Sequence, residues 1–286
     1  MANISKINGV AIASVSKLSG RTLANGDKVM GIVKPSSGGT AHTFLTKVSN
    51  WNNTNTGYGL GDVPGINVNT DLNWRTNTSD TAFGSTTANR QWTSDAGFTT
   101  PSSGTGPSDG HDSSQGIDGD GRESSGSDYV YTEASGQFNK IFLLRSPKLD
   151  FSSALSNSTL KLYFWFHMFG SNMGNLGVSA TDNSTSAGDD TLGKHFTGDT
   201  TGGLTITFWD DNSDDGSSTS SAVRITGQQQ TAGAGSTSVD AHWRLAAVDL
   251  NDLAGQSEVY LWFYSKSGAN FRSDVCIDDV EVVGEV

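Results

Sequence analysis

Residues 160–178 combine an aromatic run, a short turn and a second apolar run, and this combination indicates the fold class. Leu162–Phe169 is apolar or aromatic at nearly every position, Gly170–Gly174 supplies a turn, and apolar residues resume at Leu176. Alternation along a strand would place Tyr163, Trp165 and His167 on one face and Phe164, Phe166 and Met168 on the other. A strand with two apolar faces belongs in the middle of a fold or under a partner subunit. The stretch predicts a buried hairpin within a β-sandwich.

The composition also favours an ordered all-β chain. Glycine accounts for 35 of 286 residues and charged residues for only 17%, which suits many short strands joined by small polar turns. No window keeps a helical period for three turns, and Leu250–Gly255 is at most a short turn. We expect an antiparallel jelly-roll β-sandwich. The predicted strands are Phe44–Val48, Tyr129–Glu133, Lys140–Arg145, Leu160–Phe169, Leu176–Ala180, Leu204–Trp209, Ala222–Thr226, Trp243–Asp249, Glu258–Ser265 and Val275–Val283.

The N-terminal region contains an imperfect repeat. Residues 4–14 and 15–25 match in register, and Asn8-Gly9 and Ser19-Gly20 tolerate positive φ, so each copy can form a small hairpin or bent strand. So short a segment needs a neighbour to pack against. The apolar side chains available for that contact are Ile4, Ile7, Ile12, Val15, Leu18 and Leu23. We interpret residues 1–33 as an assembly anchor; the alternative is a strand pair folded back on its own domain.

A linker marks a domain boundary, and the charge, the cysteine count and the apolar runs exclude several classes of protein. Lys34–Thr40 is rich in Gly, Ser and Pro, and it separates the anchor from a domain spanning residues 34–286. The net charge of −12, with 18 basic residues among 30 acidic ones, argues against nucleic acid binding, which needs clustered Lys and Arg. Cys276 is the single cysteine, so we expect no disulfide within the chain. No apolar run reaches the roughly 18 residues of a membrane span.

The first residues of the chain indicate whether it carries a secretory signal. Met1–Lys6 does not lead into the apolar region of a secretory signal. We therefore expect a protein that is made in a reducing host cytoplasm and released by lysis, as virion proteins are.

Several motifs follow one another in the order found in MAM domains. They are Asp71–Trp74, Thr100–Ser108, Ser127–Ser135, Leu144–Pro147, His167–Val178 and Val275–Val280. Through them the chain resembles a MAM domain over most of residues 44–284, and the resemblance implies a jelly-roll sandwich used for adhesion or recognition. The run Ile4–Ala11 separately resembles the opening of structural proteins from tailed phages, especially marine ones.

The chain also departs from that family. The several cysteines of extracellular MAM domains are missing, and Gly110-His111-Asp112 stands where the family often has Asp-His-Thr. Residues 113–126 look like an enlarged loop.

Acidic residues in the early loops and the last strand suggest a cation site. The jelly-roll domains that this chain resembles often hold a structural Ca²⁺ there, bound by carboxylate and carbonyl oxygens. By position the candidate ligands are Asp71, Asp109, Asp112 and Asp279, with Asp278 as a further candidate. The alternative is that these carboxylates cap turns or pair with arginine.

Catalytic motifs are not apparent. The five histidines show no metal-ligand spacing, and no nucleophile elbow occurs, so we expect no enzyme activity. Most tryptophans fall in alternating strands and are assigned to the core. Trp51 and Trp92 lie in polar stretches and are candidate ligand contacts, because exposed aromatic rings stack on sugars.

The sequence thus predicts a non-enzymatic virion structural protein of a tailed phage, either a head decoration or a tail or fibre component. It would present an adhesive β-sandwich, bind other virion proteins through residues 1–33, and be compatible with a homo-oligomer. One alternative is a module that recognises host surface glycans. Another is a secreted glycan-active enzyme, which the lack of a signal peptide disfavours.

Overall fold

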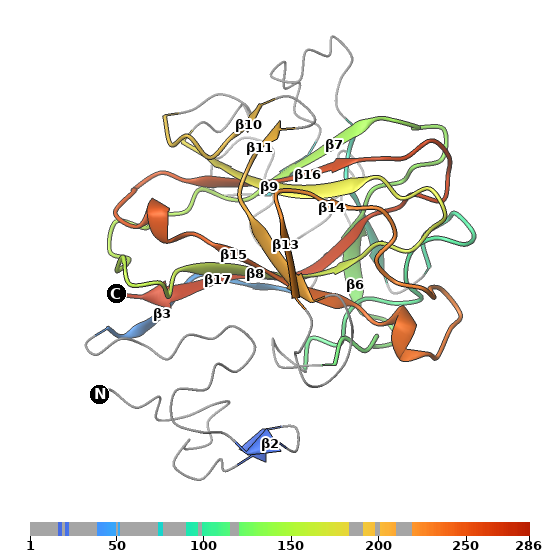
Figure 1. The fold of residues 1–286 in the computed structure, drawn as a ribbon, viewed down its shortest axis with the longest axis horizontal. Helices are drawn as coiled ribbons and strands as arrows, with labels where there is room; N and C mark the ends of the chain where they lie inside the picture. Colours follow the sequence, from blue (N-terminus) through green and yellow to red (C-terminus); the bar gives the residue numbers. More distant parts are fainter. Residues whose placement is uncertain are drawn as a thin grey trace.

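The computed structural model describes residues 17–18, 21–22, 39–49, 51, 74–76, 90–96, 99–114, 120–182, 191–197, 201–209 and 219–286. Over these residues two antiparallel sheets pack against each other, one above the other in Figure 1, which confirms the predicted β-sandwich. The helices described are two short 3₁₀ turns, η4 (Val239–Ala241) and η5 (Asn251–Leu253). In this part of the chain, no helix is long and apolar enough to cross a bilayer.

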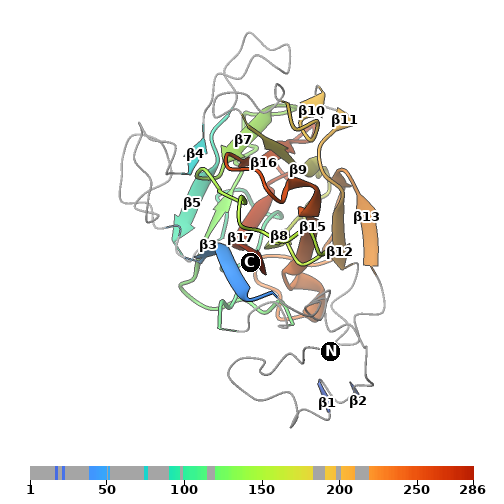
Figure 2. The same cartoon turned by 90° about the vertical axis from the view of Figure 1, so that its left-hand side faces the viewer.

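The larger sheet has eight strands in the order β13-β12-β15-β8-β17-β6-β5, and β3 also pairs with β17. Strand β17 uses one edge for β8, so β6 and β3 share its other edge; Figure 2 shows β3 beside β17. The strands are β3 (Ala41–Val48), β5 (Thr93–Ala96), β6 (Asp128–Tyr131), β8 (Lys161–His167), β12 (Ile206–Trp209), β13 (Thr219–Ala222), β15 (Arg244–Asp249) and β17 (Cys276–Glu285).

The smaller sheet has five strands in the order β14-β9-β16-β7-β4. They are β4 (Arg75–Thr76), β7 (Ile141–Arg145), β9 (Asn175–Thr181), β14 (Ile225–Thr226) and β16 (Tyr260–Lys266). A separate pair joins β10 (Phe196–Thr197) to β11 (Thr201–Gly202). The strand predicted at Ala222–Thr226 is divided, because Ala222 ends β13 in one sheet and Ile225 begins β14 in the other.

Both faces of β8 are buried, as its sequence predicted. Phe164 and Phe166 lie in the core between the sheets, where Phe164 meets Phe263 of the opposite sheet edge to face at 5.2 Å. Tyr163 and Trp165 point to the outer face and belong to a second buried cluster with Trp243. Residues before and within the enlarged loop cover that outer face: the His111 ring stacks on Trp165, and Trp243 N donates to Gly121 O at 2.8 Å.

The predicted hairpin between β8 and β9 is wrong. Strand β8 pairs with β15 and β17, whereas β9 pairs with β16 and β14, so the connection crosses from one sheet to the other. Its backbone is satisfied by neighbouring loops: Met168 N donates to Gln230 Oε1 at 2.8 Å, and Gly106 N donates to Phe169 O at 3.2 Å. A Cβ at Gly174 would lie 1.7 Å from Lys266 O, so only glycine permits this crossing. Apolar periodicity does not distinguish a hairpin from such a crossing.

In the N-terminal repeat the structure describes only β1 (Lys17–Leu18) and β2 (Arg21–Thr22), which pair antiparallel around Ser19-Gly20. Of the two forms expected for the second copy, a small hairpin or a bent strand, this pairing favours the hairpin. Ile4, Ile7, Ile12, Val15 and Leu23 lie outside the described residues, as does the side chain of Leu18.

Candidate functional site

The candidate site lies where β17 is irregular. Asp278 pairs with Trp165 and Glu281 with Tyr163, so β17 has one extra residue there relative to β8. On the opposite edge of β17, β6 pairs only as far as Ile277, and β3 pairs from Val280 onward. Asp278 and Asp279 lie between these two paired regions, where loops can approach the strand. Asp279 has a φ of 47°, a left-handed conformation that marks a β-bulge of the kind that redirects a side chain.

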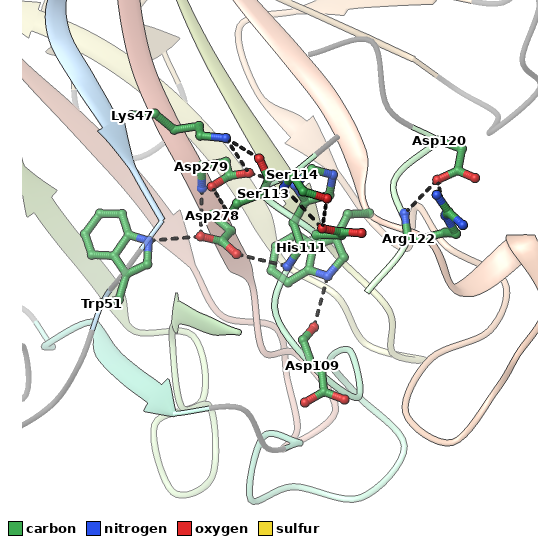
Figure 3. A network of polar contacts seen from close by, with 12 residues as sticks. Lys47, Trp51, Asp109, His111, Ser113, Ser114, Asp120, Arg122, Asp278 and Asp279 are labelled. Atoms are coloured by element: carbon green, nitrogen blue, oxygen red, sulfur yellow. Dashed lines mark hydrogen bonds and ion pairs between the residues drawn. The ribbon is translucent and has the colours of Figure 1, made fainter. Parts of the chain in front are cut away.

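Asp278 is fully buried and accepts three N–H groups (Figure 3). Its Oδ1 accepts from Trp51 Nε1 at 3.1 Å and from the backbone N of Asp279 at 2.7 Å. Its Oδ2 accepts from the backbone N of His111 at 2.9 Å. Burial raises the pKa of Asp278 well above its usual value, the neighbouring Asp279 charge raises it further, and the three N–H donors oppose both effects.

Asp279 holds the His111 ring. His111 Nδ1 lies 2.8 Å from Asp279 Oδ2, and Ser113 Oγ donates to Asp279 Oδ1 at 2.6 Å. The ring stacks on Trp165 with centroids 4.0 Å apart and planes inclined by 15°. Burial lowers the pKa of His111, although Asp279 acts in the opposite direction. Nδ1 donates its proton to the Asp279 carboxylate, and among the described residues the buried Nε2 has no hydrogen-bond partner.

A positive charge reaches this pair from β3. Lys47 Nζ lies 3.8 Å from Asp279 Oδ2 and donates to the backbone carbonyl of Ser113. The Asp279 carboxylate is thus balanced by an ammonium group and by two hydrogen-bond donors. These contacts join β3, the His111–Ser113 segment and β17 at one point.

A histidine oriented by a carboxylate is the arrangement that a general base uses in acyl-transfer enzymes. Such a base must reach a substrate proton. Here His111 is 0% exposed and Asp279 is 3% exposed, so neither group faces solvent. The arrangement is suited to fastening the bulge of β17 to two loops.

The predicted metal ligands are not brought together within the described residues. Asp109 accepts from Gly126 N at 3.1 Å, and Asp112 accepts from Ser114 N at 3.1 Å and from Ser114 Oγ at 2.6 Å. Hydrogen bonds from Ser114 lower the pKa of Asp112. Across the described ranges no group of three or more His, Cys, Asp or Glu side chains could hold a metal ion. Asp71 lies outside those ranges, and calcium stays a prediction.

The prediction that Trp51 and Trp92 contact a ligand is wrong, because both rings are 0% exposed. Trp51 donates to Asp278 and meets Trp74 edge to face at 5.2 Å. Trp92 joins the core between the sheets directly before β5. The residues next to each tryptophan are polar, and the short strands β4 and β5 show no clear apolar alternation. The sequence therefore gave no sign that these two rings belong to the core.

The sequence reasoning did not identify Lys47, Ser113 or His111 as partners of the Asp278-Asp279 pair. The available signal was Gly110-His111-Asp112, which departs from the MAM pattern at the point where the structure places the ring on Asp279. Adjacent carboxylates in a buried strand were a second signal, since such a pair requires nearby donors.

No family model and no curated protein matches this chain. Among solved structures, the chain is similar to the K1 cleaved adhesin domain of Lys-gingipain from Porphyromonas gingivalis, with 16% identity and a TM-score of 0.40, covering 86% of this chain and 98% of that one. The K3 cleaved adhesin domain of the same protein gives 17% identity and a TM-score of 0.41, covering 85% of this chain and 99% of that one. These similarities do not assign the chain to a family.

Proposed function

We propose that this chain is a non-enzymatic, adhesive β-sandwich carried on a tailed-phage particle, as a head decoration or as a tail or fibre component. The resemblance to MAM domains supports the adhesive role. The N-terminal repeat, which resembles phage structural proteins, supports attachment to other virion proteins through residues 1–33.

The observation that carries the adhesive role is a surface at one end of the sandwich, the loop end, formed by residues 99–110, 132–140 and 267–275. Asn139 N donates to Gly268 O and Ser267 N to Lys140 O, each at 3.0 Å, so two of these loops lie side by side. Phe138 is 42% exposed and Phe271 is 38% exposed. Large exposed aromatic rings on loops held by a rigid sandwich are typical of binding surfaces.

The buried ionisable groups favour binding over catalysis. His111 and His167 are both 0% exposed, and each has a hydrogen-bond partner inside the protein. The network around Asp279 is therefore part of the scaffold, and we assign the adhesive contact to the exposed rings of the loop end.

Replacing both Phe138 and Phe271 by Ala tests the adhesive role. We expect particles that carry the double variant in normal copy number to adsorb several-fold less to host cells, because the exposed rings are lost while the sandwich is retained. Leu155→Ala is the matched control: Leu155 is 38% exposed and its N donates to Glu285 O, at the far end of β17. Unchanged adsorption of the double variant would reject the loop end as the adhesive surface.

The alternative function is recognition of host surface glycans, which the same exposed rings favour, because sugars stack on aromatic faces. A glycan array probed with the full chain and the same double variant separates the two. If the full chain binds a glycan and the double variant does not, glycan recognition is supported. If the full chain binds no glycan, adhesion to a protein surface is the function that stands.

A further inference from the structure

An exposed arginine lies beside one of the exposed aromatic rings of the loop end. Phe271 and Arg272 follow each other in the loop before β17, and both side chains are exposed. Arg272 Cζ lies 5.5 Å from the centroid of the Phe271 ring, which is within the range of a cation–π contact. The two side chains therefore present one surface that is part apolar and part positively charged.

The backbone that carries Arg272 is held on both sides. Arg272 N donates to Asn270 Oδ1 at 2.8 Å, and Arg272 O accepts from Asn172 N at 3.3 Å. Gly268 N donates to Ser273 Oγ at 2.6 Å, which closes the loop around them. A loop that is already ordered loses less conformational entropy when it binds a partner.

A second loop of the loop end lies against the same side chain. A Cβ at Gly104 would be 3.2 Å from Arg272 Nε and 3.4 Å from Arg272 Cζ, so the guanidinium group lies close to the backbone of this turn. Gly104 has a φ of 76°, a conformation that glycine adopts without strain. The guanidinium group is thus positioned by the Phe271 ring and by the turn at Gly104.

The charge of Arg272 is not used inside the described part of the chain, where no carboxylate forms an ion pair with it. Other basic side chains are paired: Arg122 with Asp120 at 2.9 Å, and Lys194 with Asp252 at 2.7 Å. In a chain whose net charge is −12, Arg272 is therefore an exposed cation that can pair with an external anion.

The chemistry of this pair of side chains selects the kind of anion. A planar guanidinium group matches a carboxylate through two parallel N–H···O bonds, and an aromatic ring packs against the apolar face of a sugar. An acidic sugar carries a carboxylate and an apolar face on one ring. A polyphosphate chain would instead need clustered Lys and Arg. The net negative charge of the protein opposes an anion only weakly, because charges are screened beyond about 8 Å at physiological ionic strength.

We infer that the loop end binds an acidic polysaccharide, with Arg272 paired to a sugar carboxylate and Phe271 packed against the same sugar ring. Phe138, in the neighbouring loop, offers a second ring to the polysaccharide chain. This inference rests on the proposed adhesive role of the loop end and names the class of its ligand.

The test uses polysaccharide extracted from host cells, treated with protease and immobilised in two forms. One form is native, and in the other the sugar carboxylates have been reduced to alcohols. We expect the full chain to bind the native form about tenfold more tightly or better, because a hydrogen-bonded charge pair is lost in the reduced form. Arg272→Gln should lose the same factor on the native form and bind the reduced form as the natural chain does.

Arg122→Gln is the matched control, since it removes one exposed positive charge elsewhere and should leave both affinities unchanged. Equal binding of the two forms by the full chain would overturn the inference, as would full binding of the native form by Arg272→Gln or no binding of either form. Binding that survives carboxylate reduction but is lost in millimolar inorganic phosphate would also overturn it, because the ligand would then be a phosphate.

The adsorption experiment separates failure of this inference from failure of the proposed function. If adsorption depends on Phe138 and Phe271 but not on Arg272, the adhesive role stands and the acidic ligand is wrong. If the double variant of Phe138 and Phe271 adsorbs normally, the adhesive role of the loop end itself is wrong.

Discussion

Replacing Asp278 with Ala will lower the free energy of unfolding by at least ~3 kcal/mol, because three buried N–H groups lose their acceptor and each orphaned donor costs about 1–3 kcal/mol. The donors are Trp51 Nε1, the backbone N of His111 and the backbone N of Asp279, at 2.7–3.1 Å from the carboxylate. Two of them lie far from Asp278 in the sequence, so the substitution loosens the contact between β17 and both segments. Urea denaturation followed by tryptophan fluorescence measures the loss.

Asp278→Asn is the matched variant. Its amide oxygen can still accept the two N–H groups at the Oδ1 position, whereas the amide nitrogen faces the backbone N of His111. We expect a smaller loss of about 1–2 kcal/mol. If Asp278→Ala cost less than Asp278→Asn, the carboxylate would not be the acceptor that fastens the bulge.

Lowering the pH from about 7 to about 4 will cost about 3 kcal/mol of stability through His167 alone. Burial lowers the pKa of His167 to about 3, while its hydrogen bond to Ala241 acts in the opposite direction and the Arg244 charge lowers it further. His167 Nε2 donates to Ala241 O at 3.1 Å. The unfolded chain takes up the proton near pH 6.5 and the folded chain does not, so this stability is complete above about pH 6.5 and is lost as the pH falls toward 3.

The measurement is the free energy of unfolding against pH for the natural chain and for His167→Gln, whose amide can donate to the same carbonyl. The variant should lose less stability on acidification by about 3 kcal/mol, since glutamine does not titrate. His42→Gln, at an exposed position in β3, is the control for the exchange of histidine for glutamine. Equal slopes in His167→Gln and the natural chain would show that His167 is protonated in the folded state.

Local pattern predicted the fold class and most strands. The doubly apolar run at Tyr163–Met168 identified the central strand β8, because alternation along a strand is a local property. The path of the chain after β8 depends on distant residues. Gln230 Oε1 accepts from Met168 N, the backbone O of Arg272 accepts from Asn172 N, and Gly174 leaves room for Lys266 O. A hairpin and a sheet-to-sheet crossing have the same apolar pattern, so the sequence did not separate them.

The candidate site was predictable only in part. Asp278 and Asp279 stood out as adjacent carboxylates, but the partner of Asp279 is His111, 168 positions away. That partnership depends on the Trp165 face on which the ring stacks and on the bulge that redirects Asp279. The polar neighbours of Trp51 and Trp92 in the sequence suggested that both rings are exposed, whereas both are buried. Their burial depends on segments that are distant in the sequence.

The proposed virion role requires residues 1–33 to anchor the sandwich on the particle, and deleting these residues tests this most directly. The copy number of the chain in purified particles, measured by quantitative mass spectrometry, should fall to background, while the melting temperature of the purified shortened chain stays within a few degrees of the natural one. A normal copy number in particles that carry only the shortened chain would contradict the account.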